Sequence, residues 1–104
     1  MNPRIYRLVI RPEAVAEVAE ATGWYEQRER GLGRDFLRAF RAAAAALRRN
    51  PLQYQVVSAD ARRVVLRRFP YSVFFEVHGS EVVVLACFHE SRDPAEWRER
   101  SSRP

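Results

Sequence analysis

The feature that most constrains the fold is an unbroken apolar run from Val82 to Phe88. A strand that is apolar on both faces belongs in the interior of a sheet, because neither of its faces favours water. The preceding segment, residues 71–78, is separated from this run by Gly79-Ser80, which is typical of a two-residue hairpin turn. The sequence therefore predicts an antiparallel hairpin whose second strand, residues 81–88, is central.

The two-residue turn also predicts the register of this hairpin, because it determines which residues lie opposite each other. Counting from the turn, one face is wholly apolar and is expected to lie on helices. The other face is mixed and is expected to be open or covered by a partner. The expected apolar face pairs Val77 with Val82, Phe75 with Val84, Val73 with Ala86 and Tyr71 with Phe88, and the mixed face pairs Ser72, Phe74, Glu76 and His78 with Cys87, Leu85, Val83 and Glu81.

The N-terminal half of the chain predicts two amphipathic helices. Pro12 suits the first turn of a helix, Gly31-Leu32-Gly33 separates the two helices, and Asn50-Pro51 ends the second. We expect them to form an antiparallel hairpin. The first helix has Val15, Val18, Thr22 and Tyr25 at helical spacing, while the second has an apolar face of Leu32, Phe36, Phe40, Ala43 and Leu47 and an opposite stripe of Arg34, Arg38, Arg41 and Arg48.

Two features of these helices suggest how they pack. The Ala42–Ala46 run has no bulky side chain, so another helix is expected to approach closely there. Trp24 lies off the main stripe of the first helix. We expect it to pack between the helices, with a place in a partner groove as the alternative.

Two further strands complete the predicted fold. Alternation over Tyr6 to Ile10 indicates an N-terminal strand, and residues 61–69 form the strand that ends at a corner marked by Pro70. The length of 104 residues fits one domain, residues 1–104. We expect an α+β fold of strand, helix hairpin and three strands, with the hairpin packed on a twisted antiparallel sheet. A short C-terminal extension contains a possible helix start at 94–97 and a loose tail from about residue 99.

Charge is concentrated in two segments. The net charge is +5, and all 18 basic residues are arginine. Residues 31–50 hold five Arg and one Asp, residues 61–75 hold four Arg and no acid, and the remainder holds nine Arg and twelve acids. Such basic patches favour nucleic acid or an acidic protein segment.

Several classes of protein are not supported by the composition. Cys87 is the single cysteine, so no disulfide forms within the chain, and we expect a buried apolar side chain instead of a reactive thiol. No cofactor or metal site is expected. The apolar runs are too short to span a membrane, and no signal peptide is visible, so we expect a cytoplasmic protein.

The candidate binding residues are mainly arginines at the rim of the predicted sheet. Their guanidinium groups form forked hydrogen bonds with phosphate or carboxylate, although a solvated strand edge would also explain them. His89 is either a general base or a structural hydrogen-bonding group at a strand end. The full set of candidate contacts is Arg63, Arg67, Arg68 and Arg92 at the rim, Phe74 and Leu85 on the mixed face, and Arg34, Arg38 and Arg41 on the second helix.

Taken in order, the motifs of this chain resemble the RelE/ParE toxin family of type II toxin–antitoxin pairs, over roughly residues 4–98. The likeness is greatest to the ParE branch. The motifs are Trp24-Tyr25-Glu26, Gly31-Leu32-Gly33 with Phe36, Asn50-Pro51 with Tyr54, Arg62-Arg63, Phe69-Pro70-Tyr71, Val82 to Leu85, and His89 with Arg92-Asp93-Pro94 and Trp97.

The resemblance implies a toxin that forms a hetero-oligomer with a cognate acidic antitoxin. ParE-like members are associated with poisoning DNA gyrase and need no catalytic residue. RelE-like members cleave messenger RNA on the ribosome, and here that activity would use Arg63, His89 and Arg92. However, Val65 and Ser72 stand where that branch has basic residues, and the indole of Trp97 is no acid–base group.

We therefore expect a ParE-like gyrase poison. A RelE-like ribonuclease is the first alternative, and a degenerate module that binds the antitoxin without toxicity is the second. The antitoxin is expected to be an acidic segment, partly helical and partly extended, that wraps the domain and adds a strand at a sheet edge.

Overall fold

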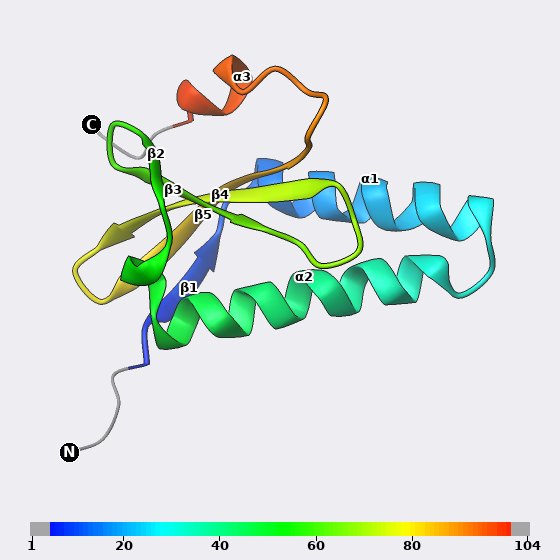
Figure 1. Ribbon diagram of the computed structural model, residues 1–104, viewed down its shortest axis with the longest axis horizontal. Coiled ribbons are helices and arrows are strands. Elements are labelled where there is room, and N and C mark those ends of the chain that lie inside the picture. The colour runs from blue at the N-terminus through cyan, green and yellow to red at the C-terminus, as the bar shows by residue number, and fades with distance from the viewer. Residues whose placement is uncertain (1–4, 101–104) are drawn as a thin grey trace.

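A computed structural model describes residues 5–100 of the chain. It confirms the predicted order of strand, helix hairpin and three long C-terminal segments of sheet, and it adds a short strand before them (Figure 1). The elements are β1 (Arg7–Ile10), α1 (Pro12–Arg28), α2 (Leu32–Arg49), the 3-10 turn η1 (Pro51–Gln53), β2 (Val56–Ser58), β3 (Ala61–Val65), β4 (Tyr71–His78), β5 (Glu81–His89) and α3 (Ala95–Arg98).

The five strands form one sheet in the order β1-β5-β4-β3-β2, so β5 is an interior strand as predicted. The sheet is antiparallel, as predicted, except at its first strand, because β1 pairs parallel to β5, with Arg7 opposite Glu81. The helix hairpin lies between these strands in sequence and carries the chain across the sheet. The strand expected to reach residue 69 ends at Val65, because Arg68 has a left-handed φ of 71°, which an extended strand excludes.

A β-bulge shifts the predicted register of the central hairpin. Near the turn, Val77 lies opposite Val82 and Phe75 opposite Val84, as expected. The next pair is Phe74 with Ala86, so Leu85 is an extra residue in β5. Glu76 with Val83 and His78 with Glu81 are also confirmed. The expected pairs beyond the bulge are wrong by one residue, and the observed pairs are Val73 with Cys87, Ser72 with Phe88 and Tyr71 with His89.

The two helices cover one face of the sheet (Figure 1). Phe36 and Leu47 of α2 pack there with Phe75 of β4, and all three are fully buried. The apolar face predicted for α2 is thus confirmed at these positions. On α1 the inward residues are Ala14, Val18 and Ala21, whereas Val15 is 53% exposed.

The two helices approach each other closely at Gly33. A Cβ atom on Gly33 would lie 2.6 Å from the backbone oxygen of Thr22, so only glycine fits. The start of α2 is also held there, because the Glu26 carboxylate accepts hydrogen bonds from the N–H groups of Gly31 and Gly33 at 3.1 Å. A carboxylate at this end of a helix is favoured by the helix dipole.

The other face of the sheet is covered by the chain itself. The indole of Trp97 in α3 stacks on the ring of Phe74, with centroids 4.5 Å apart. Phe74, Leu85 and Phe88 are buried in this second cluster, so the expectation of an open face is wrong. The guanidinium groups of Arg92 and Arg100 add to this cover, because both lie over the ring of Phe88.

The C-terminal segment is held by Arg100, whose guanidinium lies 2.8 Å from the carboxylate of Glu17. A loose tail was expected from about residue 99, but Arg100 is held by this ion pair. Residues 101–104 of the expected tail lie outside the described residues.

Candidate functional site: an aromatic pocket beside a basic rim

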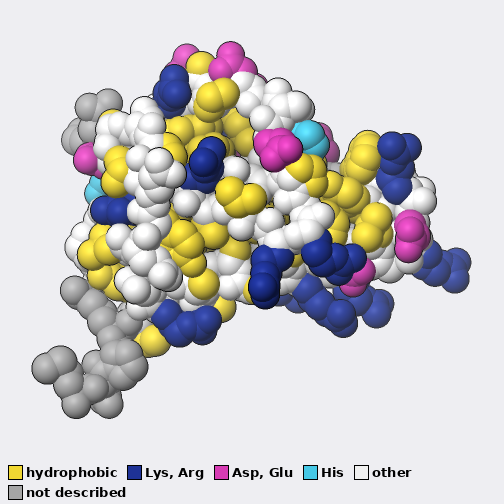
Figure 2. Space-filling model, in the orientation of Figure 1, with side chains coloured by type: hydrophobic (Ala, Val, Ile, Leu, Met, Phe, Trp, Pro, Cys, Tyr) yellow, Lys and Arg dark blue, Asp and Glu magenta, His cyan; other side chains and the backbone are white. Residues whose placement is uncertain are grey.

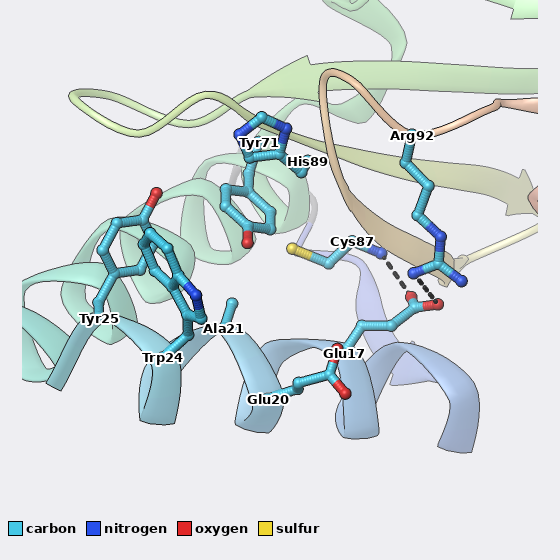
Figure 3. A pocket seen from close by; sticks show the side chains of 9 residues that line it. All are labelled: Glu17, Glu20, Ala21, Trp24, Tyr25, Tyr71, Cys87, His89 and Arg92. Carbon is cyan, nitrogen blue, oxygen red and sulfur yellow. Dashed lines mark hydrogen bonds and ion pairs between the residues drawn. The ribbon is translucent and has the colours of Figure 1, made fainter. Parts of the chain in front are cut away.

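A cavity lined by several aromatic side chains lies between α1 and the ends of β4 and β5 (Figure 3). Its volume is about 320 Å³. Residues of α1 at helical spacing form one wall, and the first residue of β4 with alternate residues of β5 form the other. The lining residues are Glu17, Glu20, Ala21, Trp24, Tyr25, Tyr71, Cys87, His89 and Arg92.

Four rings build the wall of this pocket. The Tyr25 ring meets that of Trp24 edge-on at 5.0 Å and that of Tyr71 at 6.1 Å between centroids. The Tyr71 ring in turn meets the His89 imidazole edge-on at 5.3 Å. Trp24 is 50% exposed, so the expectation that it packs between the helices is wrong, and it is the alternative position, lining a groove, that is observed.

Glu17 joins α1, β5 and the C-terminal segment. Its Oε1 accepts a hydrogen bond from the backbone N–H of Cys87 at 3.0 Å, and its Oε2 lies 2.8 Å from Arg100 Nη1 and 3.5 Å from Arg92 Nη1. β1 pairs with β5 only as far as Val84, so this edge of β5 has no strand beside Cys87. The Glu17 carboxylate takes the place of that missing strand.

The thiol of the single cysteine, Cys87, is unreactive. Burial, together with the neighbouring Glu17 carboxylate, raises the pKa of the Cys87 thiol to about 12. The thiolate is the nucleophilic form, so Cys87 is an apolar wall residue, as the sequence predicts. Burial also raises the pKa of the Tyr71 hydroxyl, with smaller contributions from Tyr25, Cys87 and Glu20.

The structure brings together three of the predicted rim residues, Arg63, His89 and Arg92. They line a small pocket of about 100 Å³ on the side of the sheet that α3 covers, together with Ser72 and Glu90. This is the grouping that the ribonuclease alternative requires. Because Phe74 also lines this pocket but is only 7% exposed, and Leu85 is fully buried, these two predicted contacts are largely inaccessible to a partner in the isolated chain.

Within this pocket, Arg92 and His89 already interact with neighbouring groups of the chain. Two nitrogens of Arg92 donate to the two carboxylate oxygens of Glu96, each at 3.1 Å, and this pairing raises the pKa of Arg92 and lowers that of Glu96. The guanidinium also lies 4.0 Å from the ring centroid of Phe88. His89 Nδ1 accepts a hydrogen bond from the backbone N–H of Ser91 at 3.0 Å, which leaves the imidazole hydrogen of the neutral ring on Nε2.

The other predicted rim residues, Arg67 and Arg68, lie apart from this pocket, because the loop after β3 turns towards α2. They line a shallow hollow of about 230 Å³ with Arg38 and Asp35. Asp35 pairs with both Arg68, at 3.7 Å, and Arg38, at 3.9 Å. Arginine side chains gather along the lower edge of the molecule, over α2 (Figure 2). Arg67 and Arg68 of the second predicted basic patch thus join the first patch, whereas Arg63 lies in the other pocket.

Sequence reasoning missed an apolar groove between α2 and β3, with a volume of about 400 Å³. The alanine run could have indicated this groove, because Ala42, Ala43 and Ala46 line it. The sequence instead led us to expect that a second helix packs there. Val65, at the open edge of the groove, is 55% exposed. The lining residues are Ala39, Ala42, Ala43, Ala46, Tyr54, Val64, Val65, Leu66 and Arg67.

Residues 5–100 contain neither a metal-binding cluster nor a membrane-spanning helix. No group of three or more His, Cys, Asp or Glu side chains in this part of the chain has the arrangement of a metal site. No helix among the same residues is long and apolar enough to cross a membrane.

Comparison with known proteins gives one family and a consistent fold. Residues 8–94 match the family described as the ParE toxin of the type II toxin–antitoxin system parDE. No curated protein matches the chain. Solved structures of similar fold include two toxin–antitoxin systems. The chromosomal ParDE toxin–antitoxin system from P. aeruginosa has a TM-score of 0.73 and 18% identity, covering 82% of this chain and 96% of that one.

The second solved structure is the toxin–antitoxin complex RelBE2 from Mycobacterium tuberculosis. Its TM-score is 0.60 at 16% identity, and the match covers 88% of this chain and 98% of that one. At such low identities these two structures bear on the fold, while the family model matches most of the chain.

Proposed function

This chain belongs to the ParE toxin family of type II toxin–antitoxin systems, and from that premise we propose that it inhibits growth by binding DNA gyrase. In this proposal the protein acts in the cytoplasm through surface contacts, has no catalytic residue of its own, and is neutralised by a cognate acidic antitoxin.

The observation that supports this choice is that two of the three residues of the small pocket, His89 and Arg92, are already held by neighbouring groups. Cleavage of a phosphodiester needs free cations for the developing charge and a base with an accessible lone pair. Arg92 is not a free cation, because it is held by Glu96 and Glu17. His89 has no free lone pair on Nδ1, because this nitrogen accepts a hydrogen bond from Ser91.

Neighbouring positions support the same choice. Val65 and Ser72 supply no charge where a ribonuclease of the related branch has basic residues. Trp97 stacks on Phe74 and is 3% exposed, so it serves packing and not proton transfer. Binding is therefore better supported than cleavage.

The arginine surface over α2 suits a negatively charged partner. Arg38 and Arg68 share the single carboxylate of Asp35, so this cluster retains net positive charge. Arg67 lies beside them and also lines the apolar groove. Forked hydrogen bonds from such arginines bind phosphate or carboxylate groups strongly.

For the antitoxin we propose the apolar groove between α2 and β3 as the docking place. β2 pairs only with the first two residues of β3, through Ser58 with Ala61 and Val56 with Arg62. The outer edge of β3 at Val64 and Val65 is therefore suited to an added strand, and the alanines admit a closely packed helix. An acidic segment with a helical and an extended part fits this surface and the neighbouring arginines.

Purified toxin tests the proposal directly. We expect it to block supercoiling by purified gyrase or to trap cleaved DNA, and to leave messenger RNA intact on ribosomes. Arg63→Ala, Arg67→Ala, Arg68→Ala and Arg92→Ala should weaken inhibition in a graded way, each by about 1–3 kcal/mol where the partner group is charged. Arg7→Ala is the matched control, because Arg7 is an exposed arginine on the far edge strand whose contact with Glu81 is weak, at 3.8 Å.

The ribonuclease alternative is favoured by one observation, the grouping of Arg63, His89 and Arg92 around one pocket. It predicts cuts in messenger RNA on ribosomes that disappear in His89→Gln, with gyrase unaffected. That outcome would reverse the ranking. A third outcome, in which the chain binds the product of a neighbouring acidic reading frame but is not toxic, would indicate a degenerate antitoxin-binding module.

A further inference from the structure

We propose that the aromatic pocket between α1 and β5 binds a cationic side chain, arginine or lysine, from a protein partner. The site is distinct from the arginine surface over α2 and from the groove beside β3. The inference deepens the proposed function by naming the chemistry that one protein partner presents, and it rests on that function only in assuming a protein partner.

The first argument is the nature of the walls. Trp24, Tyr25 and Tyr71 present ring surfaces to a cavity of about 320 Å³, and half of the Trp24 surface is exposed to it or to solvent. Ring faces attract cations through their quadrupole, and tryptophan does so most strongly. Within this chain Trp24 already makes such a contact, because the Arg28 guanidinium lies 4.4 Å from the ring centroid. Arg28 is not among the residues that line the pocket.

The second argument is the Glu20 carboxylate, on which Arg92 acts only through its charge and without an ion pair. Glu20 lines the pocket, and within residues 5–100 its side chain has no hydrogen bond or ion pair. Glu17, one turn earlier, is by contrast fully used by the Cys87 N–H, Arg92 and Arg100. Figure 3 shows the Glu20 carboxylate on the α1 side of the pocket, below the Glu17 side chain and outside the interactions of Glu17 with Cys87 and Arg92.

Charge selects the sign of the ligand. An anion would meet the Glu20 carboxylate and the negative faces of the rings, so it is disfavoured. Arg92 also lines the pocket, but its charge is offset by Glu96 and Glu17. In a chain with net charge +5, this pocket places an acidic group that has no ion pair beside aromatic rings, while the Arg92 that also lines it is already paired with Glu96 and Glu17.

The apolar part of the pocket selects a side chain in preference to a small inorganic cation. Ala21 and Cys87 line it between the rings and the carboxylates. The methylene stem of arginine or lysine packs on such a surface while the charged group lies against the rings and Glu20. A hydrated metal ion would gain nothing from this wall.

The test uses the full-length chain and three probes, Nα-acetyl-arginine amide, Nα-acetyl-lysine amide and Nα-acetyl-citrulline amide. Citrulline has nearly the shape of arginine without its charge. Binding is followed by NMR from the backbone amides of Ala21, Trp24 and Cys87 during titration. We expect saturable shifts with arginine and lysine at millimolar affinity, weaker binding at higher salt, and little or no binding of citrulline.

Two variants and a matched control locate the interaction. Glu20→Gln and Trp24→Leu should each weaken binding of the arginine probe by at least about twofold. The first removes the attraction to the carboxylate, and the second removes the attraction to the indole ring. Glu13→Gln removes the same charge from an exposed position on the same helix, outside the pocket, and should leave the affinity unchanged.

Three results would overturn the inference: equal binding of citrulline and arginine, no saturable shift at these amides with either cation, or an equal loss in Glu13→Gln and Glu20→Gln. None of these results bears on gyrase inhibition, which is measured separately. Failure of the pocket and failure of the proposed function are therefore distinguishable.

Discussion

One face of the sheet is sealed by two long helices, whereas the opposite face is covered by a helix of four residues and the side chains of two arginines. The first face buries Phe36, Leu47 and Phe75 completely and resembles the core of any small domain. The second face depends on Trp97 and on the contacts of Arg92 and Arg100 with Glu17. Extensive burial of apolar side chains keeps the two helices on the first face, whereas a few specific contacts keep the C-terminal segment on the second.

This difference teaches which parts of the molecule are open to adjustment. A large continuous core unfolds as one unit, but a short segment held by a few contacts can undock at a smaller free-energy cost. Both candidate pockets that involve His89 lie next to that short segment. The positions of Arg92 and His89 therefore depend on the weaker of the two faces.

The largest effect is expected from Phe75→Ala on the helix-covered face. The side chain is fully buried between sheet and helices, so its loss leaves a cavity and should lower the free energy of unfolding by about 3–5 kcal/mol. Urea denaturation measures it. Val65→Ala, at an exposed position of β3, is the control and should change stability by less than about 0.5 kcal/mol. A loss below about 1 kcal/mol in Phe75→Ala would mean that this face is not the main core.

A smaller effect is expected from Trp97→Ala on the other face. There the segment can undock without leaving a cavity, so only the burial of the ring is lost, about 1.5–3 kcal/mol. Trp97→Phe should cost less than Trp97→Ala, because the buried indole N–H has no hydrogen-bond partner within residues 5–100 that the change could break. Urea denaturation of both variants decides this. Equal losses in the two would show that ring burial is not what holds α3.

The approach of the two helices is tested at two glycines of the hairpin. Gly33→Ala places a methyl group against the backbone oxygen of Thr22 and should cost about 1–3 kcal/mol. Gly23→Ala meets no atom within 4 Å in the interior of α1 and should gain about 0.5–1 kcal/mol. Thermal unfolding of the pair provides the measurement. The helix-covered face would be less tightly packed than we infer if Gly33→Ala were neutral.

The smallest effect is expected at Glu17, where the two faces are joined. Glu17→Ala leaves the Cys87 N–H without its acceptor and should cost about 1–2 kcal/mol, whereas Glu17→Gln keeps an acceptor oxygen and should cost roughly half as much. Hydrogen exchange at the Cys87 amide separates the two variants, since only Glu17→Ala should accelerate it strongly. Equal protection in both would contradict the role of Glu17 as a substitute for a missing strand.

Local patterns were enough to predict most of the fold. The helical spacing of Phe36, Phe40 and Leu47 predicted the buried face of α2, and the run from Val82 to Phe88 predicted an interior strand. The sequence also predicted two basic patches and a buried, unreactive Cys87. These features depend on period, composition and turn chemistry, which are properties of short segments.

The same uniformity of residues 82–88 hid the bulge at Leu85. Register is specified by alternation between apolar and polar residues, and a strand that is apolar on both faces has none. The bulge turns Cys87 to the helices and Phe88 to α3, and it thereby places His89 beside Tyr71 in the aromatic pocket. No count along the chain from the turn could have found that arrangement.

Sequence by itself therefore determined the secondary elements, the helix-covered core and the arginine-rich character of the surface, because each follows from neighbours a few positions apart. Only the tertiary structure decided that β1 runs parallel to β5, that Trp97 closes the second face, and that Trp24, Tyr71 and Glu20 meet around one pocket. These contacts join residues tens of positions apart, and they depend on packing and on where backbone groups lack partners.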